Sequence, residues 1–272
     1  MYFSMYFCFQ FNIRVLAFRV CCICFLFLGG QVYAQGDAES NSTAYAQLWN
    51  EVNSTTAITK KLSLQLDIQF NSGNDTSKHD FNIVQHFLQY GARGWIHYLA
   101  TPNFKISAAL AMWHNLDVPQ SGQYDFNEIR NAFQLTHYYK RKRMVLSNRL
   151  RAEQRFIQNE SRTSYNFKPR VRYAPKIVYG LNKDEFVSKT LYALLMDEVF
   201  LTPMQTNLLA QNKLIVALGY NFTDDVTLEV SYTYQYKFNV DPPNEITNGI
   251  GMTLTVNNFF KKRTKTVFEP EP

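Results

Sequence analysis

The chain has 272 residues, a formal net charge of +6 and four cysteines, Cys8, Cys21, Cys22 and Cys24. Residues 25–272 therefore contain no cysteine, which excludes a disulfide, a metal–thiolate centre and a cysteine nucleophile from that part of the chain. The net charge is too small to indicate a nucleic-acid partner.

The first 34 residues have the features of a cleaved signal peptide. Arg14 and Arg19 precede an apolar run over residues 20–28, and the sequence Val-Tyr-Ala that ends at Ala34 is typical of a cleavage site. An uncleaved membrane helix is the alternative, but Arg19 interrupts the run, which falls short of the roughly 20 residues needed to span a bilayer. We expect cleavage after Ala34, which removes two arginines and leaves a net charge of +4, and a linker over residues 35–43.

Apolar and polar residues alternate along most of the remaining chain, most clearly over residues 61–70. Every second residue there is apolar: Leu62, Leu64, Leu66, Ile68 and Phe70. A period of two is that of a β-strand with one apolar and one polar face. Long strands of this kind, repeated behind a signal peptide, predict a barrel whose apolar face contacts lipid and whose polar face lines a lumen.

Eleven strands are predicted within residues 44–260. They cover residues 44–53, 61–70, 83–98, 103–114, 125–138, 143–156, 164–178, 186–201, 207–220, 225–238 and 246–258. A soluble, lipocalin-like barrel would alternate with the same period, but the charged polar rows and the aromatic ends of the apolar rows favour a membrane barrel. We therefore expect an all-β fold, an antiparallel transmembrane β-barrel of about 10–12 strands, followed by a polar tail at 261–272.

The predicted connections alternate between short turns and longer polar links. Short turns occur at 101–103, 140–143 and 221–225, and longer links at 71–80, 115–124 and 239–247. Outer-membrane barrels place their short turns on the periplasmic side and usually have an even number of strands. Eleven strands would leave the two ends of the barrel on opposite sides, so either one strand is missed or one predicted strand lies outside the barrel wall.

Charged residues gather on the polar faces of three neighbouring predicted strands. A further acid comes from the segment Asp197-Glu198, although the apolar run around it does not show which of the two faces inward. The predicted lumen set consists of Glu128, Arg130, Arg149, Arg151, Glu153, Arg155, Lys168, Arg170, Arg172 and Glu198. Such a wall either attracts anions for passage or binding, or forms a lattice in which guanidinium groups and carboxylates brace neighbouring strands. We favour the lattice, because a barrel of this size is largely filled by its side chains.

No catalytic or metal-binding pattern accompanies these charges. None of the histidines, His79, His86, His97, His114 and His137, has a serine two residues further on, the spacing that would place a base and a nucleophile on one strand face. Ser107 and His97 lie on adjacent predicted strands and could meet across them, but isolated pairs of this kind arise easily by chance. We expect no enzyme activity, no metal site and no cofactor.

The charged segments also carry a resemblance to a known family. The segments EIR at 128–130, RLRAEQRF at 149–156, RVRY at 170–173, DEVF at 197–200 and QNKLIVALGY at 211–220 occur in an order and spacing similar to an uncharacterised family of bacterial outer-membrane barrels, catalogued as a domain of unknown function. The similarity extends over the chain from about Leu48. It implies a barrel in the outer membrane and supplies no substrate, reaction or catalytic residue.

The sequence thus predicts an integral protein of the bacterial outer membrane, exported through a cleaved signal peptide, with a lumen braced by arginine and glutamate. The alternatives are a narrow anion-preferring channel or a lumenal binder of small ligands and, third, a lipid-modifying enzyme. The expected partners are outer-membrane lipids and, during biogenesis, the barrel-assembly machinery, with no nucleic acid. The sequence leaves the oligomeric state open.

Overall fold

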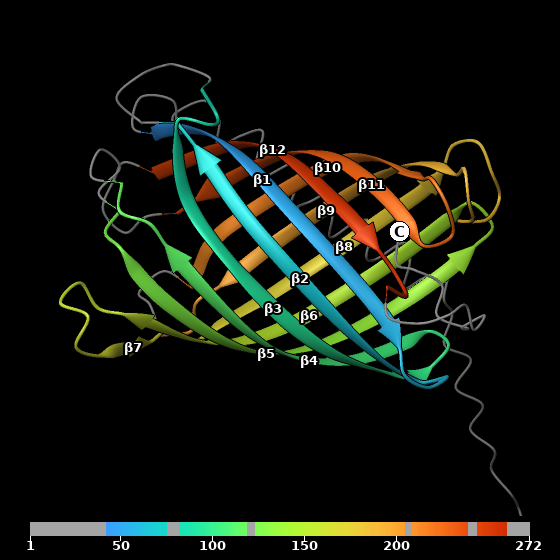
Figure 1. The fold of residues 1–272 in the computed structure, drawn as a ribbon, viewed down its shortest axis with the longest axis horizontal. Helices are drawn as coiled ribbons and strands as arrows, with labels where there is room; N and C mark the ends of the chain where they lie inside the picture. Colours follow the sequence, from blue (N-terminus) through green and yellow to red (C-terminus); the bar gives the residue numbers. More distant parts are fainter. Residues whose placement is uncertain (1–41, 75–81, 119–122, 205–207, 239–243, 260–272) are drawn as a thin grey trace, which may run out of the picture. The chain divides into compact units, whose positions relative to one another are not determined.

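The computed structural model describes residues 42–74, 82–118, 123–204, 208–238 and 244–259 (Figure 1). The chain divides into two units, residues 1–42 and 43–272, and the second contains the barrel. Within the described residues, no helix is long and apolar enough to cross a membrane. The predicted signal peptide, most of the predicted linker and the predicted tail lie outside the described residues.

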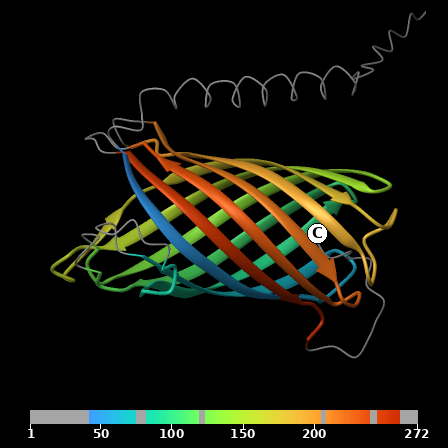
Figure 2. The same ribbon diagram turned by 90° about the horizontal axis from the view of Figure 1, so that it is seen from above.

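The predicted all-β fold is confirmed, and its strands match the predicted ranges closely. The described strands are β1 (Ser42–Ala57), β2 (Leu62–Gly73), β3 (His86–Thr101), β4 (Phe104–Asn115), β5 (Phe126–Arg141), β6 (Met144–Gln158), β7 (Tyr165–Phe167), β8 (Arg170–Gly180), β9 (Leu191–Leu201), β10 (Leu209–Asn221), β11 (Val226–Lys237) and β12 (Asn244–Val256). They form one sheet, which pairing between β5 and β6 closes into a barrel. Figure 2 shows the closed wall from a second direction.

Eleven of the twelve strands form the wall, and one pair of neighbours, β1 and β12, is parallel. Thr55 of β1 accepts a backbone hydrogen bond from Asn258 (2.8 Å) and donates its own N–H to Asn257 Oδ1 (3.2 Å), just beyond the end of β12. Nearer the starts of the two strands, the ring of Trp49 on β1 fills the space beside Gly249 on β12. The arrowheads of β1 and β12 point to the same end of the barrel in Figure 1. The strand number was therefore predicted within its range, but the expectation of a fully antiparallel barrel was wrong at this pair, because an odd number of alternating strands closes with one parallel contact.

The seventh strand is a continuation of β8 and lies outside the closed wall. β7 pairs only with the end of β6, and the hairpin they form projects beyond the barrel in Figure 1. Pro169, which has no N–H to donate, lies in the gap between β7 and β8. The predicted strand 164–178 is therefore split in two, which accounts for the difference between twelve strands and eleven wall positions.

The faces of the strands alternate as predicted, with the apolar side chains outside. On β2, Leu64, Leu66 and Ile68 are exposed on the outer surface, whereas Ser63 and Asp67 on the other face are fully buried in the barrel. A soluble ligand-binding barrel has the reverse arrangement, with an apolar interior and a polar exterior. The barrel thus has a polar lumen and an apolar outer wall.

The two ends of the barrel differ. Short turns join β1 to β2, β3 to β4, β5 to β6 and β10 to β11 at one end, here called the turn end. β1 starts at the opposite end and β12 finishes at the turn end. The first and last strands therefore begin and end on opposite sides, as expected for eleven strands in the wall. The connection from β8 to β9, residues 181–190, is the long one at the turn end. The first five residues of predicted strand 186–201 belong to this loop, because Phe186 turns inward against Tyr192.

The parallel contact can be tested with a pair of cysteines, because residues 25–272 contain none. Thr55→Cys combined with Asn257→Cys is expected to form an intramolecular disulfide, since these residues are hydrogen-bonded neighbours that line the same cavity. An antiparallel seam would instead bring Thr55 towards the start of β12. The control is therefore Thr55→Cys with Glu245→Cys. Cross-linking in the control but not in the first pair, measured by mass spectrometry of oxidised protein, would contradict the parallel closure.

Candidate functional site

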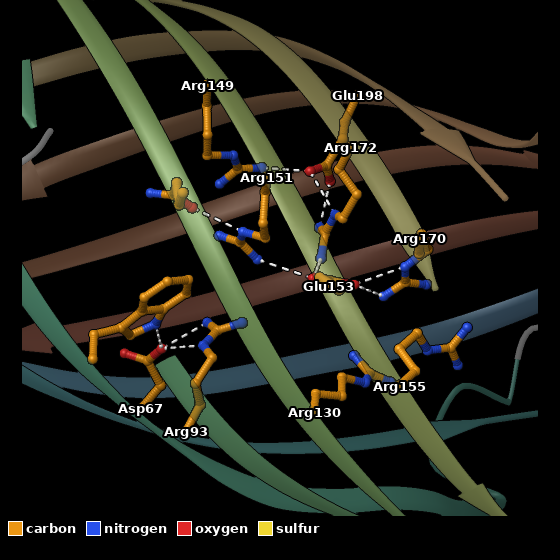
Figure 3. A network of polar contacts seen from close by, with 12 residues as sticks. Asp67, Arg93, Arg130, Arg149, Arg151, Glu153, Arg155, Arg170, Arg172 and Glu198 are labelled. Atoms are coloured by element: carbon orange, nitrogen blue, oxygen red, sulfur yellow. Dashed lines mark hydrogen bonds and ion pairs between the residues drawn. The ribbon is translucent and has the colours of Figure 1, made fainter. Parts of the chain in front are cut away.

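Inside the barrel, nine charged residues from four neighbouring strands form a charge layer of two ion-paired groups, and Figure 3 shows all of them except Glu128. They are Glu128, Arg130, Arg149, Arg151, Glu153, Arg155, Arg170, Arg172 and Glu198, from β5, β6, β8 and β9. Each lies on an inward position of its strand, so the two-residue period brings the side chains into the lumen. All nine belong to the set predicted from sequence.

Glu128 and its partners form the first group of this layer. The carboxylate accepts two hydrogen bonds from Arg130, of which the Nε bond is 2.6 Å long, and two from Arg155 on the neighbouring strand, with an Nε bond of 2.5 Å. Paired donors from one guanidinium to one carboxylate are the strongest arrangement that these groups form. Only 2 % of Glu128 is exposed, so this carboxylate is satisfied entirely by the two arginines.

Arg172 links the other two glutamates. Its Nη1 donates to Glu153 (2.9 Å), while its Nε and Nη2 donate to Glu198 (2.9 and 2.7 Å). Arg170 completes the shell of Glu153 and Arg149 completes that of Glu198, with closest contacts of 2.5 Å each. The carboxylates thereby tie β6, β8 and β9 together through their side chains.

Arg151 is the least well paired member of the charge layer. Its Nε donates to the neutral side chain of Gln134 (2.8 Å), and its closest carboxylate oxygen, on Glu153, is 3.6 Å away. Its guanidinium lies over the ring of Trp95 on β3, 4.8 Å from the centroid. Since β4 and β5 separate β3 from β6 in the wall, this contact carries the charge layer across the lumen.

A second charged cluster, which the sequence reasoning missed, lies on β2 and β3. Asp67 is 1 % exposed and accepts hydrogen bonds from Arg93 Nε (2.7 Å) and Trp95 Nε1 (3.0 Å). Asp67 and Arg93 are register partners on adjacent strands. The alternation of residues 61–70 already placed Asp67 on the polar face. The missing information was the register between β2 and β3, which pairs it with Arg93.

Lys168 and Asp197 are the two charged residues whose placement differs from the rest. Lys168 was predicted to share the inward face of Arg170 and Arg172, but it is exposed in the gap between β7 and β8, where Pro169 interrupts the strand. Glu198 faces the lumen, and its neighbour Asp197 faces outward, where it accepts a hydrogen bond from Asn212 (2.7 Å). The predicted choice of Glu198 is therefore the one that the structure brings into the charge layer.

A cavity of about 870 Å³ occupies the lumen between the charge layer and the turn end. Arg149, Arg151 and Trp95 line it on the side of the charge layer, and Asp225 and Asn258 line it at the turn end. One wall is rich in small hydroxyl side chains, contributed by Thr55, Thr227, Ser231, Thr233, Thr253 and Thr255. Glu229 lies in the same wall, between Thr227 and Ser231. The adjoining wall, from β9, β10 and the loop before β9, is apolar and contains Phe186, Leu194, Met196 and Ile215. The cavity therefore combines a cationic floor with a hydroxyl wall and an apolar wall.

The loop of residues 181–190 holds the apolar wall in place at the turn end. Ser188 donates its N–H to Asp224 Oδ1 (2.8 Å), and the backbone of Lys189 donates to Asn221 (2.6 Å). Phe186 packs on the buried cluster around Tyr192. The loop thereby narrows the turn end without filling the cavity.

His97 and Ser107 meet, as the sequence allowed, within a directed hydrogen-bond chain. Gln65 Nε2 donates to Asp67 Oδ1 (2.6 Å), which leaves Gln65 Oε1 to accept from His97 Nε2 (2.9 Å). His97 Nδ1 then accepts from the hydroxyl of Ser107 (2.8 Å). A serine nucleophile needs access to substrate, but Ser107 is 1 % exposed and does not line the cavity. In this arrangement the hydrogen-bond chain links the three strands β2, β3 and β4. The described residues contain no cluster of three side chains suited to a metal ion.

Removing Arg172 tests how much the charge layer contributes to stability. Arg172→Gln strands two buried carboxylates, and loss of one member of a buried ion pair costs about 3–5 kcal/mol. We expect a loss of that size in the free energy of unfolding, measured by urea titration of the refolded barrel. Arg143→Gln, which breaks an exposed pair with Asp184 at the turn end, serves as the control and should leave stability essentially unchanged. Equal stability of the two variants would contradict a bracing role.

The chain was also compared with known proteins. A family model described as a protein of unknown function (DUF2490) matches residues 46–246, which include most of β1, all the strands from β2 to β11 and the whole charge layer. No curated protein matches the chain, and neither does any solved structure. Because the matched region covers most of the sequence, the chain belongs to the DUF2490 family of proteins of unknown function.

Proposed function

We propose that this protein is an integral β-barrel of the bacterial outer membrane whose lumen is braced and closed by the charge layer. The observation that carries the proposal is the inverted polarity of the barrel. Leu64, Leu218 and Met252 are among many apolar residues exposed on the outer wall, while Glu128, Asp67 and Glu198 are buried inside. A contiguous apolar exterior of this extent is costly in water and favourable in lipid.

Export supports the same location. The predicted signal peptide directs the chain out of the cytoplasm, and a barrel satisfies all its backbone groups within a membrane because it has no open edge. Outer-membrane lipids and the barrel-assembly machinery are the partners that this location requires. Among the described residues, the Ser107 hydroxyl that His97 contacts is buried away from the cavity, and we propose no catalytic role.

The proposal predicts that the protein fractionates with outer-membrane material, and that its outer face tolerates charge poorly. Ile68→Arg places a cation on the exposed apolar face of β2, near the middle of the strand, and is expected to cost about 2–4 kcal/mol in lipid vesicles, as such substitutions do near mid-depth. Urea titration in vesicles measures this cost.

The matched control is Thr253→Arg. This residue lies on the opposite face of the wall and lines the cavity, where the new side chain has room and water. Its free energy of unfolding should change little. Recovery of the wild-type protein as a soluble periplasmic monomer, or equal tolerance of arginine at the two positions, would contradict the membrane proposal.

An anion-preferring channel is the second candidate, favoured by the excess of cations in the lumen. Seven arginines, including Arg93, pair with five carboxylates, including Glu51 and Asp67. We place it second because Arg170 and Arg172 are engaged by carboxylates at 2.5–2.9 Å, so they are not free to pass ions from site to site.

Planar-bilayer recording separates the two candidates. The closed barrel is expected to give no steady single-channel conductance, and Arg170→Gln is expected to be destabilised and equally silent. A channel predicts the opposite: a conducting wild type, and a stable Arg170→Gln variant whose reversal potential shifts towards cation preference. A conducting wild type together with a stable, selectivity-altered Arg170→Gln variant would contradict the proposal that the lumen is closed.

A further inference from the structure

We infer that the cavity at the turn end binds a small, hydroxylated solute through a carboxylate or phosphate group, with Arg149 and Arg151 as the anion-binding residues. This goes beyond the proposed function, because it requires only the folded lumen and not a particular membrane. The inference rests on the charge balance of the lumen, on the unfilled bonding capacity of these two arginines, and on the chemistry of the cavity walls.

The charge balance leaves positive charge without a counterion. Among the described residues of the lumen wall, seven arginines and three lysines, Lys105, Lys176 and Lys213, face six carboxylates, because Glu229 also lines the cavity. The basic groups are in excess, and buried charges that lack a counterion are costly. Glu128, Glu153 and Glu198 are already shared between two or three arginines each. One of these lysines, Lys213, lies over the ring of Trp49 at 4.5 Å. A bound anion would supply the missing negative charge.

Arg149 and Arg151 make one side-chain hydrogen bond each within the described residues, whereas the other arginines of the charge layer make two or three. A guanidinium group has five N–H donors. For Arg149 the structure gives one bond, from Nη2 to Glu198, and its Nε has no partner within the described residues. Arg151 has its single short bond with neutral Gln134. The two are inward neighbours on β6, they lie one above the other in Figure 3, and both line the cavity. In the proposed site, one oxyanion bridges these two guanidinium groups.

The walls define the rest of the ligand. The hydroxyl wall of β1, β11 and β12 offers donors and acceptors at short range, which suits the hydroxyl groups of a ligand. The adjoining apolar wall can cover the ligand's carbon skeleton. At the turn end, Asp224 accepts from Ser188 and Asp225 from Asn258. These mouth carboxylates oppose a highly charged anion and favour a small one with a single anionic group. A volume of about 870 Å³ accommodates such a molecule with water to spare.

Tryptophan fluorescence of the refolded barrel tests the inference, because Trp95 lies under Arg151 and Trp49 also lines the cavity. Two probes are titrated, inorganic phosphate and glycerol 3-phosphate, with calorimetry to confirm each isotherm. We expect saturable binding of both, with glycerol 3-phosphate tighter because its hydroxyl groups reach the hydroxyl wall. Equal affinity for the two probes would refute the role of that wall.

Variants then locate the site. Arg149→Gln is expected to weaken binding of glycerol 3-phosphate at least tenfold, and Arg149→Lys, which keeps the charge, should recover part of the loss. Arg143→Gln removes the same charge from the exposed turn end and should bind as the wild type does. A heat-modifiable band on gels shows that each variant is folded. Absence of saturable binding by folded wild-type protein, or equal weakening in Arg143→Gln, would overturn the site while leaving the membrane proposal untouched.

Discussion

The burial of three carboxylates in the lumen is the constraint on which the rest of the barrel depends. Glu128, Glu153 and Glu198 are between 2 % and 4 % exposed, and a carboxylate that is desolvated to this extent is stable only with closely bonded partners. Those partners come from neighbouring strands, so each ion pair also fixes a register. A slip of one residue between β6 and β8 would turn Arg170 and Arg172 to the outer face and leave Glu153 without them.

The lumen is unevenly filled, and this unevenness explains where the cavity lies. Arginines and glutamates fill the side of the barrel formed by β5, β6, β8 and β9. The side formed by β11, β12 and β1 carries threonine, serine and glycine, and at Gly249 the space is taken by Trp49. Large side chains on both sides would fill a barrel of this circumference. The space beside the parallel seam therefore follows from the small side chains that line it.

Much of this could be predicted from sequence, because a period of two reports directly which face of a strand a residue occupies. That rule predicted the strands to within a few residues, and nine of the ten charges that it assigned to the lumen lie there. It does not report which strands are neighbours across the lumen, so the contact between Arg151 and Trp95 and the pairing of Asp67 with Arg93 were missed. It failed at Lys168 because Pro169 interrupts the ladder and the alternation is not continuous there. The parallel seam follows from an odd strand count only once the barrel is known to close.

At Gln134, the charge layer has a neutral residue where a charged one would give a more stable ion pair. Gln134 satisfies Arg151 Nε at 2.8 Å but supplies no negative charge. A glutamate there would offer the same acceptor and also neutralise the guanidinium, and charged hydrogen bonds of this kind are about twice as strong as neutral ones. In a lumen built only as a brace, the neutral residue gains only the hydrogen bond that Gln134 Nε2 donates to Thr136 Oγ1 (3.2 Å). A buried guanidinium whose closest carboxylate oxygen is 3.6 Å away, beside an open cavity, fits a trade of stability for binding, as found where function needs a less stable arrangement.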